Sequence, residues 1–163
     1  MTYSITARRQ FTYLAQPLFF ILLFSIISYL VFNRTDYAIF GLLFIFVVDS
    51  LPVAILHIQY LLKNYHSKLV FDRSINQISY TKGNVHLSYD FKYIQRVIKV
   101  YSATNGYSIG KNSFRKYFYY KLIFNDGVEL IVTCLLADDL EIILIPIYHK
   151  EIEQCFRIFP WVV

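Results

Sequence analysis

The chain has 163 residues, of which 56% are hydrophobic, and its formal net charge at pH 7 is +5. Soluble domains are roughly 45–50% apolar, so the composition excludes an ordinary soluble protein and requires a membrane-embedded part. The basic surplus is mild and no nucleic-acid-binding motif accompanies it, so we expect no nucleic-acid partner. Cys134 and Cys155, the two cysteines, lack metal-type spacing and are expected to be free thiols in a reducing compartment.

The first apolar segment carries no charged residue from position 10 to position 33. A spanning helix needs roughly 20 apolar residues, so we predict a transmembrane helix over residues 11–32. Arg8 and Arg9 precede it, as basic residues precede a secretory signal. The run is longer than the roughly 7–15 apolar residues of a signal, and no small-residue cleavage site follows it. We therefore expect this helix to remain uncleaved.

A second apolar run covers residues 37–62 and follows the short linker 33–36. Such a short linker requires an antiparallel hairpin, which puts both ends of the hairpin on the same side of the membrane. A basic pair flanks the first helix, and Lys63 and Lys68 follow the second. Because basic residues favour the cytoplasmic side, we predict a multi-pass protein with both termini in the cytoplasm.

The stretch FVVDSLPVAILH interrupts the second run with Asp49, Ser50, Pro52 and His57. Two interpretations stay open. In the first, Asp49 and His57 line a polar path, because ionisable residues inside a membrane are functional candidates. In the second, which we favour, Pro52 breaks the helix and Asp49 or Ser50 caps its second half. His57 then marks the exit of the helix from the hydrocarbon, with Tyr60 as an interfacial anchor.

After Asn64 the apolar residues change from a helical period to a period of two, which indicates half-buried antiparallel strands. Turn residues at Gly83 and at Asp126 and Gly127 separate neighbouring strands. The predicted strands cover residues 68–73, 76–81, 84–89, 93–101, 116–125 and 128–135. Residues 138–144 are predicted as a short helix, and residues 148–153 fit either a last strand or part of a terminal helix.

Several local sequences together carry a family resemblance. A Leu-Pro pair in the second helix precedes a tyrosine, an Asp-Gly turn joins two strands, the second strand ends in Val-Thr-x-Leu-Leu, and the chain closes with Phe-Pro-Trp. The residues concerned are Leu51, Pro52, Tyr60, Asp126, Gly127, Val132, Thr133, Leu135, Leu136, Phe159, Pro160 and Trp161. In these features the chain resembles an uncharacterised group of small bacterial two-transmembrane proteins with a pleckstrin-homology-like (PH-like) domain.

The resemblance implies an α+β membrane protein of the bacterial cytoplasmic (inner) membrane. Residues 1–63 would form the transmembrane helical hairpin, and residues 64–163 a cytoplasmic PH-like antiparallel β-sheet or barrel. A typical fold of this kind ends in a long amphipathic helix. Pro146 makes the segment after Leu136 poor helix material, so we expect the helix that caps the barrel to be shortened or replaced.

The sequence offers no constellation typical of an enzyme. It lacks a phosphate-binding Gly-rich loop, a nucleophile elbow and a His-Glu-x-x-His motif. Asp138, Asp139 and Glu141 could bind a cation, but acids at a helix start more often complement the helix dipole in solvent. We therefore expect no catalytic residue, no metal and no cofactor.

A long loop within residues 101–120 interleaves basic and aromatic side chains. The members are Tyr107, Lys111, Phe114, Arg115 and Lys116. Aromatic residues favour the membrane interface, while Lys and Arg attract anionic lipid, so we predict that this loop binds lipid headgroups or a partner. The alternative is a solvated hairpin tip without a ligand.

These features predict a non-enzymatic, membrane-anchored PH-like module that binds lipid headgroups or a protein partner. Homo-oligomerisation would satisfy the polar group of Asp49 within lipid. An alternative of another class is a two-helix membrane-disrupting effector of the anti-phage type, gated by a small ligand bound to the β-domain. An immunity or accessory protein is a third hypothesis that the sequence does not separate from these two.

Overall fold

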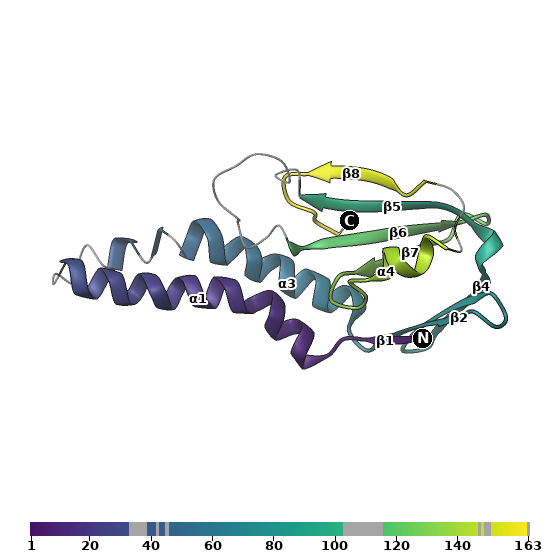
Figure 1. The fold of residues 1–163 in the computed structure, drawn as a ribbon, viewed down its shortest axis with the longest axis horizontal. Helices are drawn as coiled ribbons and strands as arrows, with labels where there is room; N and C mark the ends of the chain where they lie inside the picture. The colour runs from purple at the N-terminus through teal and green to yellow at the C-terminus, as the bar shows by residue number, and fades with distance from the viewer. Residues whose placement is uncertain are drawn as a thin grey trace.

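The computed structural model describes residues 1–32, 39–41, 43–44, 46–102, 116–146, 148 and 151–162, without the side chains of residues 31, 32, 48 and 49. In this part of the chain, helices project from one end of a β-rich domain (Figure 1). The domain contains two four-stranded sheets. The architecture is therefore α+β, with a long apolar helix near the N-terminus.

The projecting helices form a pair with opposite chain directions. One arm is α1 (Ala7–Phe32), and the other consists of the π-helical turn η1 (Phe46–Ser50) followed by α3 (Leu51–Asn64). The arms lie side by side (Figure 1). α1 begins before the predicted residue 11 because Thr6 caps it: the Arg9 N–H donates to Thr6 Oγ1 at 3.3 Å and the Gln10 N–H to the Thr6 carbonyl at 3.1 Å.

The predicted interruption of the second arm near residues 49–52 is confirmed as a change of helix type. Pro52 lies in the first turn of α3, where its missing N–H removes no helix hydrogen bond. The wider π-helical turn of η1 precedes it. Of the two predicted caps, Asp49 or Ser50, the structure rules out the second, because the buried Ser50 hydroxyl makes no cap hydrogen bond. The Asp49 side chain lies outside the described residues.

The first sheet is antiparallel and starts with a strand that was not predicted. Its strands are β1 (Thr2–Ser4), β2 (Ser67–Asp72), β3 (Gln77–Lys82) and β4 (Val85–Asp90), in that order. Tyr3 lies opposite Leu69, so the segment before α1 and the segment after α3 belong to one sheet. Gly83, at φ +54°, forms the turn between β3 and β4.

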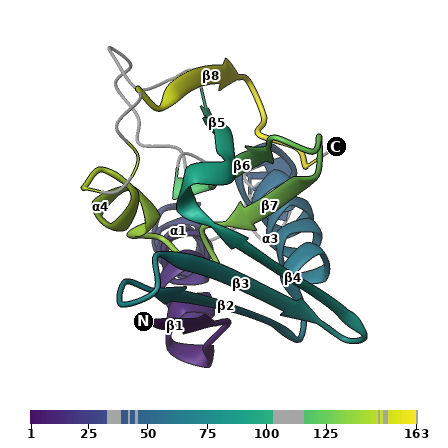
Figure 2. The ribbon, with the colours of Figure 1, turned by 90° about the vertical axis from the view of Figure 1, so that its right-hand side faces the viewer.

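The second sheet follows the short 3₁₀ helix η2 (Phe91–Tyr93). Its strands are β5 (Ile94–Ser102), β6 (Phe118–Phe124), β7 (Glu129–Thr133) and β8 (Glu153–Arg157), in the order β7-β6-β5-β8. β8 runs parallel to β5, so this sheet is mixed rather than purely antiparallel. The strands of the first sheet run across the direction of the helix pair, whereas β5 and β8 run along it (Figures 1 and 2).

The core of the domain lies between the two sheets. The first sheet contributes Leu69, Phe71 and Ile78, and the second contributes Val97, Leu122 and Phe124. The short helix α4 (Leu140–Leu144) adds Leu140 and Leu144 to the same cluster. α4 has five residues, so the short helix predicted for residues 138–144 is confirmed, and the structure shows no longer helix in the described residues after it.

Candidate functional site

The inner face of α3 is part of the domain core. Its buried residues recur at helical spacing and are Val53, Leu56, His57, Tyr60 and Asn64. They pack on the face of the second sheet that lies away from the first, against Val100, Tyr119 and Ile131. Tyr13 of α1 joins this second cluster. The base of the helix pair is therefore fixed to the domain by buried contacts.

His57 lies within that core and not on an open helix surface. It is 6% exposed, and its Nδ1 lies 2.9 Å from the Tyr117 hydroxyl. Tyr117 also packs edge-on against Tyr60 and tilted against Tyr13. The imidazole therefore has a partner in the β-domain. His57 was one of the two residues proposed to line a polar path between the helices. Because its side chain points into the domain instead, this interpretation is weakened.

The C-terminal strap, residues 158–162, lies across α3. Gln59 Nε2 donates to the Val162 carbonyl at 2.9 Å, and Gln59 Oε1 accepts from the Val162 N–H at 3.2 Å. The Tyr60 hydroxyl donates to the Pro160 carbonyl at 2.7 Å. Because Tyr60 is 0% exposed, its predicted role as an interfacial anchor is wrong. The tyrosine instead holds the strap against the second cluster.

The outer surface of the helix pair is apolar and open. The segment Ala7–Leu30 is long and apolar enough to cross a membrane, and only 17% of its most apolar window is buried. On α1 the exposed large apolar residues are Phe11, Leu18, Phe19, Phe20, Leu22, Leu23, Ile26, Ile27, Tyr29 and Leu30, and on α3 they are Leu51, Ile55, Ile58 and Leu62. A surface of this size and kind calls for lipid or another apolar partner.

One rim of the domain faces the direction in which the helices project. β5 and β8 end there and β6 begins there (Figure 1). We call Lys116, Arg157 and Ile158 the helix-side rim. Both basic side chains are exposed, and Ile158 is 73% exposed. Lys116 directly precedes Tyr117, the partner of His57, so the structure brings the end of the predicted lipid-binding loop next to the base of the helix pair.

The other predicted loop residues cannot be placed beside Lys116. Tyr107, Lys111, Phe114 and Arg115 lie outside the described residues. Their assignment to lipid binding stays a prediction. Arg157 and Ile158 were not predicted, because the sequence around β8 fits a helix as well as a strand and gives no signal that its end meets the end of β5.

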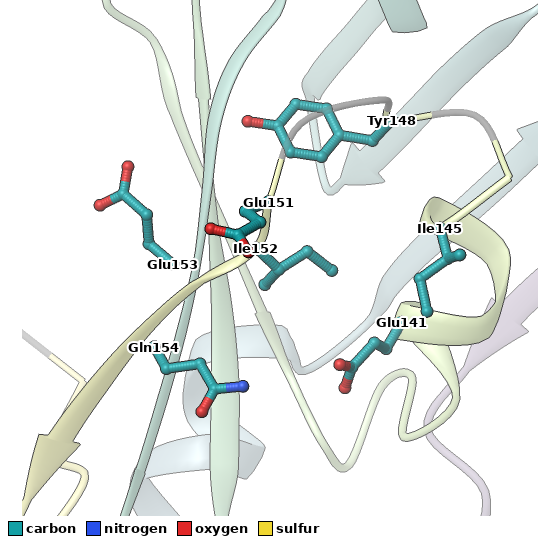
Figure 3. Close-up of a pocket in the computed structure, with 7 residues that line it drawn as sticks. All are labelled: Glu141, Ile145, Tyr148, Glu151, Ile152, Glu153 and Gln154. Carbon is teal, nitrogen blue, oxygen red and sulfur yellow. The ribbon is translucent and has the colours of Figure 1, made fainter.

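A cavity of about 680 Å³ lies between α4 and the segment that leads into β8 (Figure 3). Its described lining consists of Glu141, Ile145, Tyr148, Glu151, Ile152, Glu153 and Gln154. Two of the three carboxylates already have cationic partners. Lys99 donates to Glu141, and Arg96 donates to both oxygens of Glu153 at 2.8 and 2.6 Å. These hydrogen bonds hold the pKa of both carboxyl groups below the usual value.

The chemistry of this cavity is that of a polar groove. Glu141 and Glu153 are kept ionised by their cationic partners, and the described lining contains no histidine, cysteine or serine. The groups therefore offer hydrogen bonds and negative charge to a ligand, but no nucleophile with an adjacent base. Tyr148, whose pKa is raised by burial, adds a phenol that donates to the Gln95 carbonyl at 3.3 Å.

The predicted acidic cluster does not converge on a cation. Asp138 forms an ion pair with Arg9 at 3.1 Å, Asp139 accepts from the Tyr3 hydroxyl at 3.2 Å, and Glu141 accepts from Lys99. Each acid therefore has a different partner. Within the described residues, no group of three or more His, Cys, Asp or Glu side chains is arranged to hold a metal ion.

The fold agrees with a comparison against protein families. The model of a PH domain family matches residues 2–144. The match begins at the first residue of β1 and ends at the last residue of α4, so it includes the helix pair, the first sheet and strands β5 to β7 of the second sheet, but not β8. The chain belongs to this PH domain family. A comparison with curated proteins gives no match, and a comparison with solved structures gives none either.

Proposed function

We propose that this protein is a non-enzymatic binding or scaffold module of the bacterial cytoplasmic membrane, anchored by the helix pair. The observation that carries the proposal is the difference between the two faces of α3. Its inner face is core, while its outer face continues the open apolar surface of α1. In this arrangement the PH domain stands directly on the cytoplasmic side of the membrane, with both termini in the cytoplasm.

The ligand that fits this position best is the headgroup layer of anionic lipid. Lys116 and Arg157 supply positive charge at the helix-side rim, and Ile158 supplies an exposed apolar side chain beside them. Basic and apolar residues together suit an anionic membrane surface. A protein partner at the same rim is the other occupant that a scaffold role allows.

Anchoring is tested by alkaline extraction of membranes from cells that express the full chain. We expect the wild-type chain to stay in the pellet. The double variant Leu22→Arg and Ile26→Arg places two charges on the open face of α1, each costing about 2.5–3.5 kcal/mol at the centre of a spanning helix, and should release the chain. The matched control is Ile75→Arg on the exposed β2–β3 turn, which should stay in the pellet.

Headgroup binding is tested with the full chain in lipid nanodiscs. Amide hydrogen exchange at residues 155–158 should slow when phosphatidylcholine is partly replaced by phosphatidylglycerol. Lys116→Glu with Arg157→Glu should abolish the change. Lys92→Glu is the control, because Lys92 lies in η2, just before the start of β5 and therefore at the opposite end of that strand from the rim.

The cavity between α4 and β8 favours one alternative, a membrane-disrupting effector gated by a small ligand. Its volume of about 680 Å³ lies in the range of small-molecule sites. An effector of this kind would depolarise the membrane of expressing cells when its ligand is supplied. A scaffold would leave the membrane potential unchanged under the same conditions.

A further inference from the structure

A smaller groove with two arginines in its described lining lies at the start of α1. Its volume is about 230 Å³ and its described lining is Thr6, Arg8, Arg9, Thr12, Tyr13 and Asp138. The groove combines the first turns of a long apolar helix with the chain segment that follows β7. It is separate from the helix-side rim and from the cavity beside α4, since no residue is shared between them.

The Arg9 guanidinium binds groups of the protein itself. Its guanidinium donates to the carbonyls of Leu136 and Leu135, the latter at 3.4 Å, and forms an ion pair with Asp138 at 3.1 Å. These contacts attach α1 to the segment after β7. The positive charge of Arg9 is therefore balanced by Asp138, the one carboxylate in the described lining of the groove.

Arg8 is different, because its guanidinium is exposed and has no hydrogen-bond or ion-pair partner among the residues that the structure describes. The groove thus holds one uncompensated positive charge. The Thr12 hydroxyl does not bind the Arg8 guanidinium, since it donates instead to the Arg8 main-chain carbonyl at 3.0 Å. The first backbone N–H groups of an α-helix add partial positive charge at the same end.

The level of Arg8 along the helix matches that of lipid phosphates. Phe11, 67% exposed, is the first large apolar side chain on the open face of α1. Arg8 precedes it by three residues, or about 4.5 Å along the helix axis. The headgroup layer on each side of a bilayer is roughly 5–8 Å thick. With Phe11 at the edge of the hydrocarbon, the guanidinium reaches the phosphate layer.

We propose that this groove binds the phosphate of an anionic phospholipid of the cytoplasmic leaflet, with Arg8 as its cationic ligand. The planar guanidinium presents two parallel donors to two phosphate oxygens. The bound lipid would lie beside the Arg9–Asp138 pair, where α1 joins the domain. The inference rests on the proposed function only in that α1 must enter a membrane.

The test is native mass spectrometry of the full chain released from nanodiscs that contain phosphatidylcholine and phosphatidylglycerol. We expect the wild-type chain to retain phosphatidylglycerol. Arg8→Gln should weaken that retention about tenfold or more, the loss typical of a charged hydrogen-bonded pair. Arg8→Lys keeps the charge without the paired donors and should fall between the two. Lys92→Gln removes a basic residue of η2 that does not line the groove, and should behave as the wild type.

Two results would overturn the proposal. One is equal phosphatidylglycerol retention by Arg8→Gln and wild type, with matching thermal melts showing that both are folded. The other is displacement of the lipid by millimolar inorganic phosphate, which would make the groove a site for the free anion. Alkaline extraction distinguishes these results from failure of the anchoring. If only the lipid site is wrong, wild type and Arg8→Gln both stay in the membrane pellet, whereas both are released if the helix pair is not a membrane anchor.

Discussion

Asn64, the last residue of α3, binds the backbone of β7 at Thr133. Its Oδ1 accepts from the Thr133 N–H at 2.9 Å, while its Nδ2 donates to the Ile131 carbonyl at 3.1 Å. The amide therefore pairs with an edge strand much as a peptide group of a neighbouring strand would. Because Asn64 is fully buried, this contact fixes the end of the helix pair to the second sheet.

Replacing Asn64 by alanine should destabilise the protein by about 2 kcal/mol or more, because it leaves a buried N–H and a buried carbonyl without partners. The measurement is urea unfolding of the full chain in detergent. Asn64→Asp keeps the acceptor for Thr133 but loses the donor to Ile131, and should also be destabilised. An alanine variant as stable as the wild type would show that the contact does not hold α3 to the sheet.

The end of the strap at Val162 should loosen from α3 when Gln59 is replaced by alanine, because both hydrogen bonds to Val162 are lost while that of Tyr60 to Pro160 remains. Trp161, the single tryptophan, packs in the strap against the second cluster and reports the change. We expect its fluorescence to shift to longer wavelength and exchange of the Val162 amide to accelerate. Gln77→Ala in β3 provides a comparison on another element. Identical emission from Gln59→Ala and wild type would contradict the assigned role.

His57 and Tyr117 should show a coupled effect on stability. His57→Leu leaves the buried Tyr117 hydroxyl without its partner, and Tyr117→Phe leaves the imidazole Nδ1 without its partner, so each should cost about 1–3 kcal/mol. The double variant removes both groups and should be less destabilised than the sum of the two single variants. Thermal melts in detergent measure this, and strict additivity would argue against the hydrogen bond.

The ion pair of Glu141 and Lys99 predicts a pH dependence. The hydrogen bond from Lys99 lowers the pKa of Glu141 in the folded state, and Tyr120 donates to the same oxygen at 3.2 Å. The ion pair therefore contributes its full stabilisation of the fold above the unfolded-state pKa of Glu141, about 4.3. This contribution is lost as the pH falls through the lower, folded-state pKa. The difference in melting temperature between wild type and Glu141→Gln should shrink on acidification from pH 6.

A matched control for that experiment is Glu129→Gln. Glu129 pairs with Lys121 at 2.7 Å, but its side chain is 47% exposed, so its pair should contribute little. We expect its melting curve to follow the wild type across the pH range. A wild-type-like response of Glu141→Gln at pH 6 would show that the Lys99 pair does not stabilise the fold.

The sequence predicted the elements whose period was regular. Alternation of apolar residues located the strands from β2 to β7, and Pro52 located the start of α3. β1 was missed because a strand of three residues, Thr2–Ser4, is too short to show a period. Its existence depends on β2, which lies far along the chain, so only the fold brings the two together.

The site could be predicted only in part, because burial depends on contacts between distant segments. His57 and Tyr60 have the spacing of a helix face, but the sequence does not say whether lipid or a sheet covers that face. In the structure, part of that cover is the C-terminal strap, whose Pro160 and Val162 lie about a hundred positions later in the chain and accept hydrogen bonds from α3. The sequence marked Arg8 only as a topological signal. That Arg8 has no partner among the described residues becomes visible only in the fold, where Arg9 pairs with Asp138.

The most direct test of the account is the depth of the α1 surface in a bilayer, measured by spin labelling in nanodiscs. In a background with Cys134→Ala and Cys155→Ser, labels at Leu22 and Ile26 should be accessible to oxygen and protected from a water-soluble nickel chelate. A label at Ile75, on the β2–β3 turn, should show the reverse. Equal access of the nickel chelate to all three positions would contradict a membrane-anchored PH domain.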